Sequence, residues 1–158
     1  MKKIFTVLVS ILLLICSFAS CSKIEYNATI LKEGFTFNKE WLENNYTRGS
    51  YQSEYNSELP ESRTYVINHQ DDADEIFSEF PQIDFDTEMV ILYCYTTIYV
   101  REQKLNSVSF ENGVLNIEFN VVKGKIGIAD ATAPQTRTCI IRLDKVEATE
   151  IIITYNGQ

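Results

Sequence analysis

A hydrolytic site built on a nucleophile and a base would need the only histidine of this 158-residue chain. His69 would be the base of a Ser-His-Asp or Cys-His arrangement, with the nucleophile coming from elsewhere in the sequence. No nucleophile motif accompanies it, and it stands where a helix is expected to begin. We therefore interpret His69 as a turn residue, assign no catalytic residue, and expect a protein that is not an enzyme.

Metal and phosphate sites are not predicted either. Asp84, Asp86 and Glu88 alternate as at the start of a calcium loop, but the required glycine and the distant bidentate glutamate are missing. One histidine and the two cysteines in strand-like runs, Cys94 and Cys139, show no zinc-ligand spacing. Residues 123–127 lack the spacing of a phosphate-binding loop. We interpret these segments as a solvated turn and a flexible connection, and expect no metal and no cofactor.

The four cysteines are the remaining candidates for chemistry. Cys16 and Cys21 lie close to the N-terminus, whereas Cys94 and Cys139 lie in apolar, strand-like runs. The latter two could form one disulfide in an oxidising compartment, or stay as free thiols in the core, where cysteine is often buried. The sequence leaves both alternatives open.

The first twenty residues have the organisation of an export signal. Lys2 and Lys3 form a positively charged start, residues 4–15 are an apolar run, and residues 18–20 end in small side chains before Cys21. The apolar run is too short to favour a membrane-spanning helix. These features predict a signal peptide.

Ala19-Ser20-Cys21 resembles the lipobox of bacterial lipoproteins, with Phe18 at the position where leucine is usual. The resemblance implies lipidation of the Cys21 sulfur, removal of residues 1–20, and anchoring by more than one acyl chain, which is enough for stable attachment. It predicts a location on the extracytoplasmic face of a bacterial cell membrane. An ordinary secretory signal with a coincidental cysteine is the alternative.

The chain is acidic, with 14 Lys and Arg against 22 Asp and Glu and a formal charge of −8. Loss of Lys2 and Lys3 with the signal would leave 12 basic residues and a formal charge of −10. Such a surface repels nucleic acid and anionic headgroups. We therefore expect no nucleic-acid partner, and the lipid itself must attach the protein to the membrane.

Two helices are predicted from capping residues and apolar spacing. Asn38 can cap a short helix over residues 39–45. Asn68 can cap a longer helix, which Pro81 ends. The apolar stripe of this second helix must pack on a sheet, and it consists of Ala73, Ile76, Phe77 and Phe80.

The strands that would form this sheet follow directly. Residues 88–95 are apolar on both alternations, which is typical of a central strand covered on both faces. Asn112-Gly113 predicts a two-residue hairpin turn. Pairing outward from the turn sets apolar residues against each other, so a one-residue slip would expose the apolar set. The predicted pairs are Glu111 with Val114, Phe110 with Leu115, Ser109 with Asn116, Val108 with Ile117, and Ser107 with Glu118.

Further strands are expected over residues 63–68, 137–143 and 150–154. The expected fold class is α+β: an antiparallel sheet of about five strands with one principal helix packed on it. Residues 21–33 are expected to be a tether or an edge segment, and residues 34–158 a single domain.

The order of these elements over residues 62–153 resembles the C-terminal domain of PrcB-type lipoproteins. The residues that carry the resemblance are Phe85 and Asp86, Val90–Tyr93, and Pro134, although Thr97-Ile98-Tyr99 replaces the usual Gly-Gly-Tyr. The resemblance implies a lipoprotein that serves as an accessory subunit of a surface protease complex, with no catalytic role of its own. The shared pattern consists of fold residues, and a fold alone does not define a function.

Two segments have the composition of binding loops. Tyr46, Tyr51 and Tyr55 lie among Ser, Asn and Gly, a mixture found in many recognition loops. The 14-residue connection 123–136 carries Ile126 and Ile128, which could cover the sheet as a lid or contact a partner.

These observations favour a membrane-anchored, non-enzymatic binding or accessory module with a protein partner. A small hydrolase or protease inhibitor, and a carrier of a small ligand beneath the long connection, are the alternatives. An effect of His69→Ala on activity would favour the hydrolase.

Overall fold

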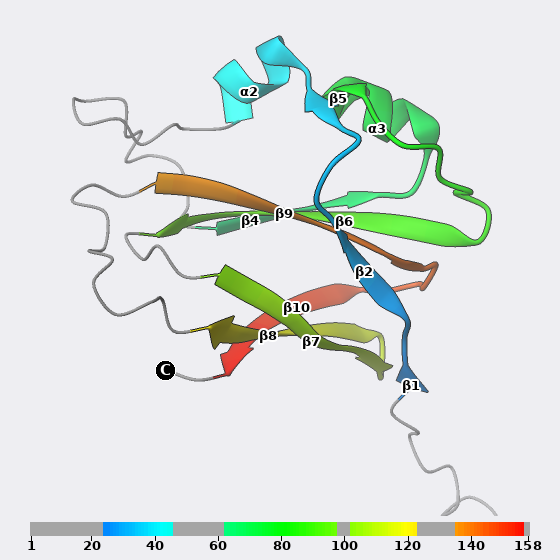
Figure 1. The fold of residues 1–158 in the computed structure, drawn as a ribbon. Helices are drawn as coiled ribbons and strands as arrows, with labels where there is room; N and C mark the ends of the chain where they lie inside the picture. Colours follow the sequence, from blue (N-terminus) through cyan, green and yellow to red (C-terminus); the bar gives the residue numbers. More distant parts are fainter. Residues whose placement is uncertain (1–23, 46–61, 98–101, 123–134, 157–158) are drawn as a thin grey trace, which may run out of the picture.

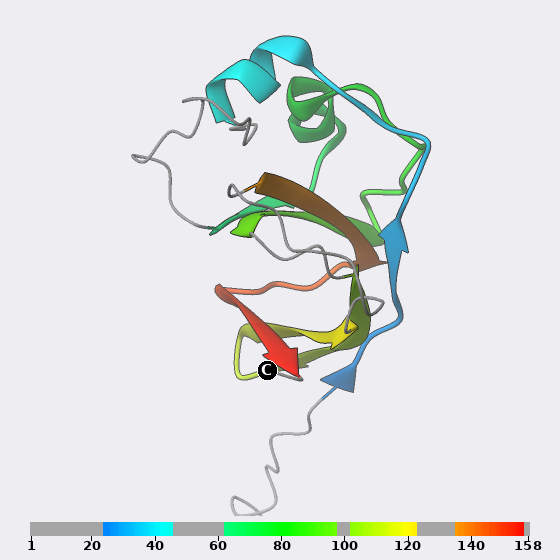
Figure 2. The same ribbon diagram turned by 60° about the vertical axis from the view of Figure 1, so that its left-hand side comes forward.

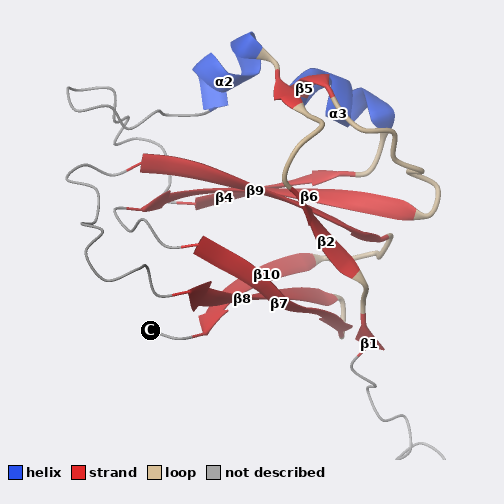
Figure 3. Ribbon diagram, viewed as in Figure 1, coloured by secondary structure: helices blue, strands red, loops and turns tan. Residues whose placement is uncertain are grey.

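The computed structural model describes residues 24–45, 62–97, 102–122 and 135–156. Within these ranges the chain forms ten strands and two helices (Figures 1 and 3). The elements are β1 (Ile24–Glu25), β2 (Ala28–Leu31), β3 (Thr36–Phe37), α2 (Lys39–Asn45), β4 (Ser62–Ile67), α3 (Gln70–Ile76), β5 (Phe77–Glu79), β6 (Glu88–Thr97), β7 (Glu102–Glu111), β8 (Val114–Val122), β9 (Gln135–Asp144) and β10 (Glu150–Asn156).

Strand β6 lies inside a four-stranded sheet with the order β2-β9-β6-β4, in which all neighbours are antiparallel. Val90 and Leu92, on one alternation of β6, belong to the apolar cluster beneath the helices. Met89 and Ile91, on the other alternation, belong to a second cluster between two sheets. All four side chains are at most 1% exposed. The prediction of a central strand covered on both faces is confirmed, and this strand needs a layer on each side.

The layer on one face consists of α2, α3 and the two-stranded sheet of β3 and β5 (Figure 1). Trp41 of α2 is buried there, stacked on Phe37 with ring centroids 5.7 Å apart and edge-on to Tyr65 at 5.3 Å. Asn38 Oδ1 accepts a hydrogen bond from the backbone N–H of Glu40 at 3.1 Å, so the predicted cap is confirmed. Helix α2 has the predicted bounds.

Helix α3 is shorter than predicted. It ends at Ile76, and Phe77–Glu79 pairs with β3 as a short strand. The backbone N–H of Asn38 donates to the C=O of Ile76 at 2.8 Å, so this carbonyl already has a donor from outside the helix. The ring of Phe77 packs against Phe37 at 4.8 Å. Tertiary contacts with the N-terminal segment therefore replace the last predicted turn of the helix.

The layer on the other face is a second four-stranded sheet, with the order β1-β7-β8-β10. The hairpin of β7 and β8 contains all five predicted pairs, among them Val108 opposite Ile117. Asn112 and Gly113 have φ angles of 53° and 83°, the positive values that the predicted turn requires. Val108 and Ile117 are almost fully buried against the first sheet.

The fold is therefore mainly β, and the arrangement differs from the single five-stranded sheet with one helix that we expected. Two four-stranded sheets face each other, and the helices cover the outer face of one of them (Figure 1). Strand β10 also runs parallel to β8, with Ile151 opposite Leu115 and Ile153 opposite Ile117. Since β9, in the other sheet, separates β8 from β10 along the chain, no hairpin forces these two strands to be antiparallel.

The N-terminal segment, expected to be a tether or an edge segment, forms β1 and β2 at the edges of both sheets. Strand β1 pairs with β7 in one sheet, and β2 pairs with β9 in the other. Figure 2 shows this segment running along one side of both sheets.

Two glycines with the same φ provide a test of the hairpin turn. Gly113→Ala should lower the free energy of unfolding by about 2 kcal/mol, of which about 1 comes from the positive φ and the rest from displacing Thr149. A Cβ at Gly113 would lie 2.9 Å from Thr149 Oγ1, which donates to the Gly113 C=O. Gly34→Ala is the matched control, because Gly34 also has φ of 83° but open space around it. Urea unfolding measures both, and equal losses would contradict the contact.

Candidate functional site

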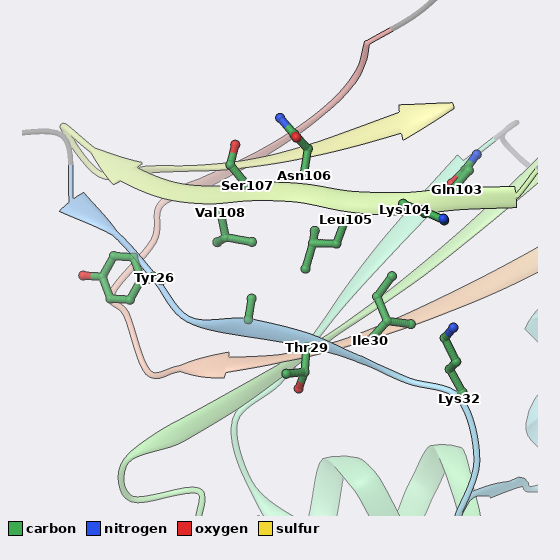
Figure 4. Close-up of a pocket in the computed structure, with 11 residues that line it drawn as sticks. Tyr26, Thr29, Ile30, Lys32, Gln103, Lys104, Leu105, Asn106, Ser107 and Val108 are labelled. Atoms are coloured by element: carbon green, nitrogen blue, oxygen red, sulfur yellow. The ribbon is translucent and has the colours of Figure 1, made fainter. Parts of the chain in front are cut away.

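A groove of about 390 Å³ lies between β7 of one sheet and β2 of the other. Leu105 and Val108 point from β7 toward β2, and Ile30 points from β2 toward β7 (Figure 4). Tyr26 lies at one end of this groove, and the side chains of two lysines, Lys32 and Lys104, lie at the other (Figure 4). Its size falls in the range of small binding sites, and its floor is apolar.

The groove exists because one segment serves both sheets. Strand β1 pairs with β7 only at Phe110 and Ser109, and the N–H of Tyr26 then donates to the C=O of Val108 at 2.9 Å. After Asn27 the chain leaves this sheet and pairs with β9 as β2. Among the described residues, no strand therefore pairs with the outer edge of β7 before Val108.

A bulge in β7 sets which side chains enter the groove. The register against β8 shifts between Leu105 and Ser107, so Asn106 and Ser107 share the outer face of the sheet. Both donate to the carboxylate of Glu118, Ser107 Oγ at 3.0 Å from Oε2. Asn156 donates to the other oxygen of the same carboxylate. The shift returns Leu105 to the interior, where it forms part of the groove floor.

The groove differs in charge from most of the acidic protein. Its lining includes Lys32 and Lys104 and contains no carboxylate. Neither lysine has an ion-pair partner among the described residues, whereas Lys39 pairs with Glu43 and the ammonium of Lys145 donates to a backbone carbonyl. The two lysines make one end of the groove a favourable place for an anionic group.

A group of aromatic side chains packs in the apolar cluster between the two sheets. Tyr155 Oη donates to Tyr93 Oη at 2.7 Å, and Tyr93 stacks on Tyr95 with ring centroids 5.1 Å apart. Burial, and after it the bond to Tyr93, raises the pKa of Tyr155. This phenol therefore stays neutral near pH 7 and serves as a hydrogen-bonding group in the core.

The predicted binding loops and the lipidation site cannot be placed. Cys21, the three tyrosines Tyr46, Tyr51 and Tyr55, and the isoleucines Ile126 and Ile128 lie outside the described residues. His69 is the N-cap residue of α3, and its side chain is exposed and forms no cap hydrogen bond. Asn68, which we predicted to be the cap, is therefore not the N-cap residue. Its backbone N–H donates a hydrogen bond to the carboxylate of Asp72 at 3.3 Å.

The acidic residues just before β6 and at its first position form contacts within the fold. Asp84 accepts hydrogen bonds from the N–H of Asp86 at 3.2 Å and from the hydroxyl of Thr87 at 2.9 Å. Glu88 accepts two bonds from Arg142, at 2.7 and 2.6 Å, and these bonds hold the pKa of Glu88 below its usual value. No group of three or more His, Cys, Asp or Glu among the described residues could hold a metal ion. The interpretation as a turn agrees with the contacts of Asp84 and Asp86, whereas Glu88 is the first residue of strand β6.

The structure contains no bond between Cys94 and Cys139, although a disulfide was one of our two alternatives. Tyr93 lies opposite Cys139 and Cys94 lies opposite Thr138, so the two sulfurs point to opposite faces of the sheet. Cys94 belongs to the cluster beneath the helices and Cys139 to the cluster between the sheets. Burial raises the pKa of each thiol to about 12.

The thiols should accordingly be unreactive in the folded protein. Labelling of the mature chain with a thiol-specific reagent at pH 8 should modify neither Cys94 nor Cys139 until denaturant unfolds the protein, because only the thiolate reacts and both side chains are buried. Mass spectrometry counts the labels. A mass that shows two hydrogens missing, or labelling without denaturant, would contradict the placement of these residues.

Comparison with known proteins adds no assignment: no protein-family model, no curated protein and no solved structure matches this chain. Within the described part of the chain, neither helix has the length and apolar character needed to cross a membrane.

One pattern in the sequence indicates the bulge that shapes the groove. Alternation along β7 places Gln103 and Leu105 in one phase but Val108 and Phe110 in the other, and such a change of phase indicates a bulge. The pairing of β1 and β2 with different sheets left no such pattern, because the two strands are only two and four residues long.

Proposed function

We propose that the protein is a lipid-anchored lipoprotein on the extracytoplasmic face of a bacterial membrane, and that its folded domain is a non-enzymatic binding or accessory module. The observation that carries the anchor is the segment Phe18-Ala19-Ser20-Cys21, which follows a charged start and an apolar run as in lipoprotein signals. Cleavage before Cys21 makes this residue the N-terminus of the mature protein, and Cys16 is removed.

The anchor would hold the domain close to the membrane. Only Ser22 and Lys23 separate Cys21 from the first residue of β1, so an extended chain spans about 10 Å at most between Cys21 and Ile24. Ile24 is 48% exposed, and its position near the lipid gives this apolar side chain a suitable environment. In this orientation the Tyr26 end of the groove faces the membrane and the lysine end points away.

The binding role is supported by the groove and by the resemblance of residues 62–153 to the C-terminal domain of PrcB-type lipoproteins. The groove offers an apolar floor, an open strand edge and two lysines, which suit recognition rather than proton transfer. The resemblance favours a protein partner, and a surface protease complex is the first candidate.

Crosslinking of intact cells tests the proposal. Wild-type protein should be recovered from membranes with acylated Cys21 and with a partner captured in about equimolar amount, whereas Cys21→Ala should be unprocessed or released and should lose the partner. Cys16→Ala is the matched control and should behave as the wild type, since Cys16 leaves with the signal. Membrane retention of Cys21→Ala, or repeated capture of no stoichiometric partner by the wild type, would contradict the proposal.

A further inference from the structure

We infer that the groove between β2 and β7 binds an acidic peptide segment in extended conformation, which adds to the open edge of β7 as a further strand. The inference rests on the proposed function as a binding module and names the chemistry of its partner.

The backbone of β7 is suited to strand addition. In a two-residue hairpin, the backbone N–H and C=O groups of every second residue point to the partner strand. The C=O of Val108 accepts a hydrogen bond from the N–H of Tyr26, so the backbone groups of Val108 point away from β8, to the other edge of β7. The bulge shifts this alternation by one residue, so the N–H and C=O groups of Leu105 and Gln103 turn to the open edge. At about 3.3 Å per residue, the edge from residue 102 to 107 accommodates a segment of about five residues.

The partner segment would pair with β7 next to β1, where the pairing of β1 stops. Strand β1 already pairs antiparallel with the end of β7, and Tyr26 marks where that pairing stops. A strand added beyond Tyr26 would direct alternate side chains toward the groove floor formed by Leu105 and Ile30. Its other side chains would face solvent, so an alternating apolar and polar sequence fits best.

The two lysines select for negative charge on this segment. Lys104 belongs to β7 and Lys32 directly follows β2, and their side chains lie at the same end of the groove (Figure 4). Screening at physiological salt limits exposed charges to a range of about 8 Å, so the two lysines act on a bound segment more strongly than charges that lie farther away than this range. An aspartate or glutamate at the end of the segment that is remote from Tyr26 would be favoured.

The same features restrict what can pair. Bulges and edge lysines discourage unselective pairing between sheet edges, and β7 has both. A segment without an acidic residue would leave Lys104 unmatched, and a segment without an apolar residue would leave Leu105 uncovered. The edge is therefore open to one class of partner and protected against others.

Titration with designed peptides tests the inference on the mature chain, residues 21–158 with Cys21→Ser. The probes are synthetic seven-residue peptides in which valine alternates with threonine and two aspartates stand at one end or the other. Two-dimensional amide NMR should show saturable shifts at Gln103, Leu105 and Ile30. A version with lysines in place of the aspartates should bind at least about fivefold more weakly, as expected for one or two exposed ion pairs.

Matched variants distinguish an effect of the groove lysines from an effect of the net charge of the protein. Lys104→Glu should weaken binding of the acidic peptide about fivefold or more, whereas Lys39→Glu, which changes the net charge equally on α2, should leave it unchanged. A peptide with N-methyl groups on the amides that face β7 keeps its charge and side chains but cannot pair, and it should not bind. Binding of this peptide, equal effects of the two lysine variants, or no shift in β7 at millimolar peptide would overturn the inference.

The outcome of the peptide titrations does not depend on the lipid anchor. Absence of lipid on Cys21 would refute the proposed location and leave these titrations unaffected. A groove that binds none of the peptides would refute the inference, while the lipoprotein anchor and a partner at another surface would stand.

Discussion

The structure depends on one constraint: the inner strand β6 is apolar on both faces, so its sheet must be covered on both sides. Ile91 and Leu92 are adjacent in β6, point in opposite directions, and are both 0% exposed. The helices with β3 and β5 cover one face, and the hairpin β7–β8 with β10 covers the other. The same constraint separates Cys94 from Cys139, since the sheet itself lies between their side chains.

The groove follows from how the N-terminal segment serves this arrangement. The segment pairs with one sheet as β1 and with the other as β2, and eight residues cannot complete both edges. If the whole segment paired with β7, β2 could not pair with β9. If the whole segment paired with β9, β1 could not pair with β7. The open edge of β7 thus results from the topology. The segment that covers only part of this edge begins a few residues after the proposed attachment point at Cys21.

Much of the local structure could be predicted, because it depends on near neighbours in sequence. The hairpin register followed from Asn112-Gly113 and side-chain alternation, and α2 followed from the cap at Asn38. The second sheet, the parallel β10 and the early end of α3 at Ile76 could not, since each depends on contacts between distant segments. Alternation in β10 is the same for either direction of pairing. The binding loops and Cys21 that sequence indicated lie outside the described residues, and the groove that the structure indicates was not predicted.

Hydrogen exchange of single amides in β7 tests the open edge most directly, because the strand contains its own control. The amide of Lys104 faces β8, where this residue pairs with Asn120, whereas the amides of Gln103 and Leu105 face the groove. We expect Lys104 to exchange slowly and its two neighbours to exchange fast in the free protein, and the neighbours to slow when an acidic peptide is added. Equal protection of all three amides in the free protein would show that the edge is already covered and would contradict the account.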